Sequence, residues 1–156
     1  MLNGKPSILF LSTGDATRSR MAGAFFRKLE GEKFDVICTT VDAAVSHPLA
    51  SVAMTEAGID ISSALSVSIA DTLKRGFTCV ITISDATRER HPIFPFTPRL
   101  VHWSIEDRVG SERSADRGLE LIRRVGDDIA DQLSQFIAGI GPTAVVPLRE
   151  WEPAAA

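Results

Sequence analysis

The residues of this chain best suited to chemistry form a small-residue turn that contains an arginine, Ser12-Thr13-Gly14-Asp15-Ala16-Thr17-Arg18-Ser19. The apolar run Ile8–Leu11 before it predicts a buried strand, and the apolar spacing from Met21 to Leu29 after it predicts a helix. A turn between a strand and a helix N-terminus directs backbone N–H groups and the positive end of the helix dipole toward one point. Arg18 adds a permanently charged guanidinium that can bind an anion through two N–H groups. The turn is therefore predicted to bind an anion.

The same stretch resembles the phosphate-binding loop of the low-molecular-weight protein tyrosine phosphatases and of their thioredoxin-coupled arsenate reductase relatives. That loop consists of a cysteine, five residues and Arg-Ser, directly after the first strand. Ser12, Arg18 and Ser19 hold the matching positions here, so a serine replaces the nucleophilic cysteine. The resemblance implies that residues 12–19 form an oxyanion-binding loop without its attacking sulfur. A serine hydroxyl is far less acidic than a thiol and attacks only beside a general base, so a binding or structural role is favoured for Ser12.

Asp15 is a second departure, because the family usually has asparagine at this position of the loop. Both residue types tolerate a left-handed backbone and bond to local groups, so one interpretation of Asp15 is conformational. The other is electrostatic: at about 5 Å and an effective dielectric of about 20, each unit of anion charge would meet roughly 3 kcal/mol of repulsion. We therefore expect weaker oxyanion binding than in the parent family, unless Asp15 is protonated or points away.

Two further positions of the resemblance lack sulfur. The arsenate reductase relatives have cysteines at the positions of Ser84 and His91, and these cysteines pass a disulfide outward from the loop. Together with Ser12, all three redox positions lack a thiol, which predicts that no thiol relay can operate. Cys38 and Cys79 lie inside apolar runs and are predicted to be buried structural thiols. Because Ser12 and Ser84 both follow predicted parallel strands, we expect them to face the same crevice.

Asp107 is the remaining candidate for acid–base chemistry. The segment Trp103–Asp107 resembles the one that carries the family's general acid, but Arg108 follows where the family usually has proline. A surface aspartate in a polar loop is an interpretation of equal weight. His91 could act as a base for Ser12 only if its loop folds inward, and a solvated surface position is favoured.

Composition excludes few classes of protein. The 156 residues carry a formal net charge of −3, with 44% apolar and 24% charged residues, as in an ordinary globular domain. This charge does not favour nucleic acid or an anionic membrane as partner. No apolar run has the length of a membrane span and residues 1–6 lack a signal-peptide pattern, so a cytoplasmic protein is predicted. The scattered His47 and His102 are predicted to have packing or capping roles, and neither a metal nor another cofactor is indicated.

The order of predicted elements alternates between strand and helix. This alternation predicts an α/β fold with a parallel sheet covered on both faces, and the resemblance implies a three-layer sandwich with a central four-stranded sheet. Residues 1–142 are predicted to form one domain, followed by a C-terminal tail, residues 143–156. The other predicted elements are strands at Phe34–Val41, Phe77–Ile83 and Leu100–Trp103, helices at His47–Ala57, Ile69–Lys74 and Ser114–Ile140, and a connection at Ile59–Ser66.

These observations favour a phosphatase-like protein that resembles arsenate reductase but has lost its cysteine chemistry. Its expected ligand is a small oxyanion (phosphate, arsenate or sulfate) or a phosphorylated molecule, bound for a binding or regulatory purpose. One alternative is an active phosphatase or arsenate reductase in which Ser12, natural or engineered, stands at the nucleophile position. Another is an interaction protein that uses the old pocket as a partner surface.

Overall fold

A computed structural model describes residues 5–41, 45–63, 65–84 and 99–140. Four strands and three of the helices match the predicted elements closely, and the long C-terminal helix α4 begins one residue after its predicted start. The described elements are β1 (Ser7–Ser12), α1 (Thr17–Glu30), β2 (Asp35–Thr40), α2 (Pro48–Glu56), the 3-10 helix η1 (Ile61–Ser63), β3 (Leu65–Ser66), α3 (Ile69–Leu73), β4 (Cys79–Ser84), β5 (Leu100–Ser104) and α4 (Ala115–Ile140).

The sheet is parallel throughout, with the strand order β3-β2-β1-β4-β5. Its four principal strands confirm the predicted α/β fold with a four-stranded parallel sheet. The two-residue strand β3 adds a short outer edge, where Leu65 pairs with Ile37. The sequence predicts only a connection in this stretch, because two residues are too few to show a strand pattern.

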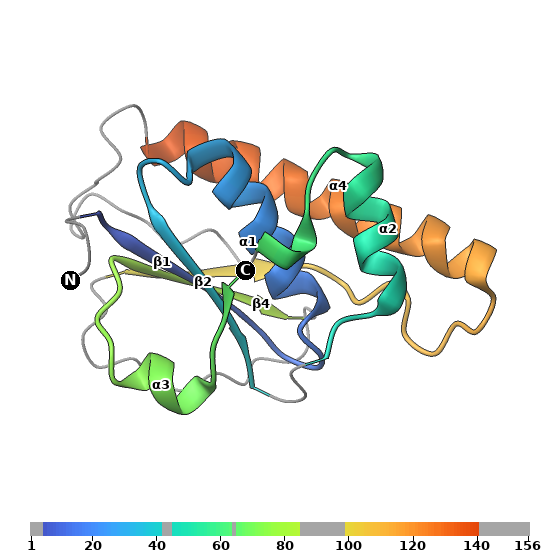
Figure 1. Ribbon diagram of the computed structural model, residues 1–156, viewed down its shortest axis with the longest axis horizontal. Coiled ribbons are helices and arrows are strands. Elements are labelled where there is room, and N and C mark those ends of the chain that lie inside the picture. Colours follow the sequence, from blue (N-terminus) through green and yellow to red (C-terminus); the bar gives the residue numbers. More distant parts are fainter. Residues whose placement is uncertain (1–4, 42–44, 64, 85–98, 141–156) are drawn as a thin grey trace.

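Alternating side chains divide the core between the two faces of the sheet. Ile8 and Phe10 of β1 belong to the larger cluster, which packs against α1, α2 and α4. Leu9 and Leu11 belong to a smaller cluster that includes side chains of α3. Figure 1 shows the resulting three layers, with α3 on one side of the sheet and the other helices opposite.

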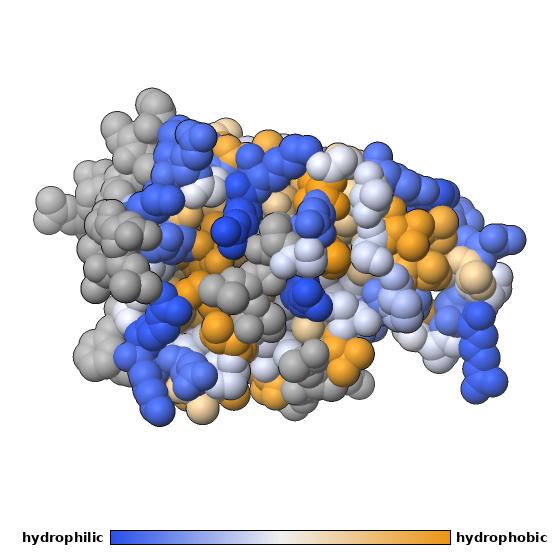
Figure 2. Space-filling model, viewed as in Figure 1, coloured by the Kyte–Doolittle hydropathy of each residue, from blue (hydrophilic) through white to orange (hydrophobic). Residues whose placement is uncertain are grey.

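The outer surface of the described part is mixed in hydropathy. Figure 2 shows hydrophobic side chains between hydrophilic ones on the face that it presents. The large apolar side chains that are exposed come from different elements: Leu29 from α1, Val52 from α2, Leu100 from β5, and Val45 from the segment before α2. Single exposed apolar side chains of this kind are normal on a globular protein and indicate no particular partner.

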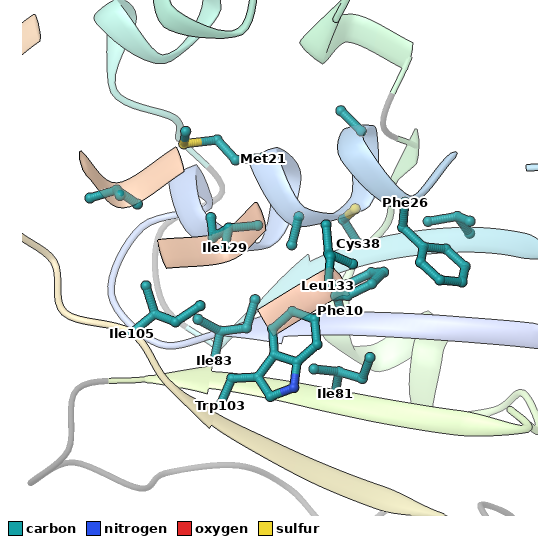
Figure 3. Close-up of a cluster of buried hydrophobic side chains, with 14 of the residues drawn as sticks. Phe10, Met21, Phe26, Cys38, Ile81, Ile83, Trp103, Ile105, Ile129 and Leu133 are labelled. Atoms are coloured by element: carbon teal, nitrogen blue, oxygen red, sulfur yellow. The ribbon is translucent and has the colours of Figure 1, made fainter. Parts of the chain in front are cut away.

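Aromatic side chains form the centre of the larger cluster. Figure 3 shows Phe10, Phe26 and Trp103 close together between the sheet and the helices, and the rings of Phe26 and Trp103 each lie 5.8 Å from that of Phe10. Cys38 is buried in the same cluster, and both it and Cys79 are free thiols. Burial raises the pKa of each thiol to about 12, and the predicted burial of the two cysteines is confirmed.

Local signals account for the start and end of α2. Pro48 is its first residue, and the imidazole Nδ1 of His47 accepts a hydrogen bond from the Leu49 N–H at 3.1 Å, which confirms a capping role for His47. Gly58, with a φ of +75°, takes the left-handed conformation just after the helix.

Some predictions lie outside the described residues. They include the end of α4 at Gly141-Pro142 and the tail 143–156, so the domain boundary at residue 142 stays a prediction. Within the described part of the chain, no helix is both long and apolar enough to cross a membrane.

Candidate functional site

The predicted anion-binding turn lies at the carboxyl end of β1, at the centre of the sheet. Ser12 is the last residue of β1 and is fully buried, and α1 begins at Thr17. The Ser12 hydroxyl donates a hydrogen bond to the Asp15 carbonyl at 2.9 Å, and its oxygen lies 2.9 Å from the Ser19 hydroxyl oxygen. The strand–turn–helix geometry therefore matches the sequence prediction, with Ser12 on the inside of the turn.

Three backbone N–H groups of the turn already have protein acceptors. Thr13 donates to the Ile83 carbonyl of the neighbouring strand at 3.2 Å, and Ala16 donates to the Val45 carbonyl at 2.8 Å. The N–H of Thr17 donates to the Asp15 carboxylate at 3.0 Å. These three N–H groups therefore hold the turn together and do not point toward a free anion site. The sequence prediction had all of the turn amides converging on an anion.

Two further features fix the path of the backbone. Gly14 has a φ of +80°, and a Cβ at this position would lie 3.6 Å from the Arg18 guanidinium. From β2, the Thr40 hydroxyl lies 3.0 Å from the Gly14 carbonyl oxygen and 3.1 Å from that of Ser12. Sequence reasoning missed Thr40, because only the register of β2 beside β1 brings it to the turn.

Arg18 joins the turn to a distant segment. Its side chain is buried, and its guanidinium donates to the Ile105 carbonyl at 2.6 Å and to the Thr13 carbonyl at 2.8 Å. Since Ile105 lies two residues before Asp107, this bond places the segment of the predicted general acid beside the turn. Asp107 itself is exposed and accepts a hydrogen bond from the Gly110 N–H at 3.3 Å.

Ser84 lies at the same edge of the sheet as Ser12, but the two side chains point to opposite faces. Ser12 pairs with Ile83, and successive side chains of a strand alternate between the faces. The Ser84 hydroxyl is instead 3.3 Å from Nε2 of His102. The expectation that both serines face one crevice is therefore wrong, and the reason is a register offset of one residue.

His102 forms a polar cluster that sequence reasoning missed. Its Nδ1 lies 2.7 Å from the Thr82 hydroxyl oxygen, and Thr82 is its partner across β4 and β5. The sequence contained a signal for this position. His102 alternates with the apolar residues Val101 and Trp103 along its strand, which indicates that its side chain lies on the opposite face of the sheet from theirs. His91 lies outside the described residues. In the part of the chain that is described, no three His, Cys, Asp or Glu side chains are grouped to hold a metal ion.

A cavity of about 320 Å³ lies away from the turn, between α1, α2 and α4. Met21, Phe25, Met54 and Ile122 supply apolar walls, and Gly126 of α4 borders it without a side chain. At its rim, the guanidinium of Arg123 holds the Glu56 carboxylate through two bonds of 2.8 and 2.7 Å and lowers the pKa of that carboxyl. No residue of the turn lines this cavity.

Comparison with known proteins gives consistent matches. No protein-family model matches the chain. It is 33% identical to an arsenate reductase of Halalkalibacterium halodurans and 29% identical to one of Bacillus subtilis, covering 85% and 83% of this chain and 95% and 93% of those proteins. A solved arsenate reductase described as being in the phosphate binding state superimposes with a TM-score of 0.69 at 26% identity, covering 87% of this chain and 99% of that one. An arsenate reductase in the reduced state gives a TM-score of 0.70 with the same identity and coverage.

Proposed function

The chain belongs to the low-molecular-weight protein tyrosine phosphatase and arsenate reductase family, and on this premise we propose that it is a catalytically degenerate member, a pseudoenzyme, that binds a small oxyanion. The proposed anion-binding residues are Ser12, Thr13, Gly14, Asp15, Ala16, Thr17, Arg18 and Ser19 of the turn. Phosphate and arsenate are the proposed ligands, free or as part of a phosphorylated molecule. The role would then be to bind or regulate rather than to turn over a substrate.

The environment of the Ser12 hydroxyl is the observation that carries this proposal. Among the residues that the structure describes, its partners are a backbone carbonyl and the Ser19 hydroxyl, and neither is a general base that could take its proton. Burial at Cys38 and Cys79 raises each thiol pKa to about 12, so little thiolate is present at neutral pH. Neither oxygen nor sulfur of these residues is thus activated for attack on phosphorus or arsenic.

Support for oxyanion binding comes from the fold and from a relative. The turn joins a central strand of a parallel sheet to a helix N-terminus, the usual position for binding a phosphate group. One solved relative is an arsenate reductase in a phosphate binding state. Arg18 keeps a guanidinium inside this turn, within reach of an anion that replaces one of its carbonyl partners.

Calorimetric titration with phosphate and arsenate tests the proposal. We expect saturable heat for the parent protein, and a loss of at least about tenfold in affinity for Arg18→Ala and Arg18→Lys, because both variants lack the charged fork. Arg123→Ala is the matched control, since it removes the same charge from α4 outside the turn. Circular dichroism verifies that each variant is folded. A parent protein that binds neither anion while folded would contradict the proposal and favour an interaction protein.

An active phosphatase is the second candidate, favoured by one observation. The bond from Arg18 to Ile105 holds the segment of Asp107 beside the turn, where a general acid would be needed. This candidate predicts hydrolysis of an aryl phosphate by the parent protein and its loss in Asp107→Asn. No turnover above that of Arg18→Ala would eliminate it. A cytoplasmic location stays a prediction from the sequence.

A further inference from the structure

We propose that Asp15 makes the oxyanion turn select anions that carry a proton, such as hydrogen phosphate and hydrogen arsenate, over fully deprotonated sulfate. This inference rests on the oxyanion-binding function proposed above. It names a substrate class for the same site and assigns a specificity role to one residue of the turn.

The first step is the place of the Asp15 carboxylate. One of its oxygens accepts the Thr17 N–H at 3.0 Å, so the carboxylate lies over the first turn of α1. This is where the helix dipole and the N-terminal amides attract an anion. The side chain is half-buried, so it is only partly screened by water. An anion that enters the turn therefore has a negatively charged carboxylate as its neighbour.

The second step is the hydrogen-bonding capacity of that neighbour. An ionised carboxylate only accepts hydrogen bonds, through two oxygens, and the Thr17 bond occupies one of the two. An unprotonated oxygen of the anion cannot donate a hydrogen bond to the Asp15 carboxylate, because both groups are acceptors, and their like charges repel. A P–OH or As–OH group instead donates a charge-assisted hydrogen bond to it.

The third step compares the anions at neutral pH. Phosphate and arsenate keep at least one proton, whereas sulfate keeps none. An acceptor that is partly withdrawn from water disfavours a ligand that lacks the matching donor, because the acceptor is then left unpaired and the like charges repel. Since Thr13 and Ala16 have already committed their N–H groups to Ile83 and Val45, the turn has fewer donors with which to compensate sulfate.

Titrations of phosphate and sulfate into the parent protein, Asp15→Asn and Asp131→Asn at pH 7 test the proposal. Asp131→Asn is the matched control, because it removes an exposed carboxylate from α4. In the parent protein and in this control, phosphate should bind at least about tenfold more tightly than sulfate, the ratio expected for one charged hydrogen bond. In Asp15→Asn, whose amide also has a donor, the ratio should fall to within about threefold.

The outcomes separate the two proposals. Equal affinity of the parent protein for phosphate and sulfate, or an unchanged ratio in Asp15→Asn, would overturn the selectivity while the binding function stands. If neither the parent protein nor Asp15→Asn binds any of the anions, the oxyanion-binding function itself fails.

Discussion

Replacing Arg18 should cost far more stability than its position in an anion-binding turn would suggest. Its guanidinium makes two short bonds to the carbonyls of Thr13 and Ile105, in a side chain that is 5% exposed. A hydrogen bond that involves a charged group contributes about 1.5–3 kcal/mol, and Arg18→Ala leaves both carbonyls without this donor. We therefore expect a loss of about 3–5 kcal/mol in the free energy of unfolding. At about 2–4 °C per kcal/mol for a chain of this size, the midpoint should fall by about 6–20 °C.

Urea denaturation followed by circular dichroism measures this loss, with the slope of the transition as a check on two-state unfolding. Arg123→Ala is the control, because Arg123 also makes two short bonds, to the Glu56 carboxylate, but about half of its side chain is exposed. An exposed pair is screened by water and contributes little. Arg18→Lys should lie between the two, since one ammonium cannot replace the fork. Equal losses for Arg18→Ala and Arg123→Ala would refute the reasoning.

Four more predictions concern the nucleophile, the cavity and the thiols. Ser12→Cys should give measurable hydrolysis of an aryl phosphate if only the nucleophile was lost, and continued inactivity would place a further defect elsewhere in the turn. Gly126→Ala should raise the free energy of unfolding by about 1 kcal/mol, because alanine favours the helix and its Cβ would meet Met21 at an ordinary 3.5 Å; a loss of stability on denaturation would contradict this. Cys38 and Cys79, with pKa values of about 12, should not react with a thiol reagent at pH 8 until the protein unfolds. Since a thiol of the unfolded chain ionises near its ordinary pKa of 9.0, stability should fall as the pH rises above 9, and a flat profile up to pH 11 would contradict it.

The main elements were predictable because each shows its signal locally. The apolar run Ile8–Leu11 indicates a strand buried on both faces, as the central strands of a parallel sheet are. The apolar spacing that runs from Leu119 to Phe136 indicates α4, because it repeats at the helical period over several turns. Local signals of this kind need no knowledge of distant residues.

The bonding of the turn was not predictable in the same way. Its N–H group at Ala16 is taken by Val45, and its carbonyl at Thr13 is taken by Arg18. Such pairings depend on the three-dimensional path of the chain rather than on a pattern in the sequence. The opposed side chains of Ser12 and Ser84 are different, since a strand register combined with simple alternation would have revealed them.

The two carbonyl bonds of Arg18 bear on what the presence of an arginine at this position means in a related sequence. A residue that both fastens the architecture and serves chemistry is under two kinds of selection. If the chemistry were not needed, the structural demand on Arg18 would remain, because the carbonyls of Thr13 and Ile105 would still need this donor. An arginine at this position is therefore no evidence of turnover by itself, because its two carbonyl bonds give it a structural role that is independent of any chemistry.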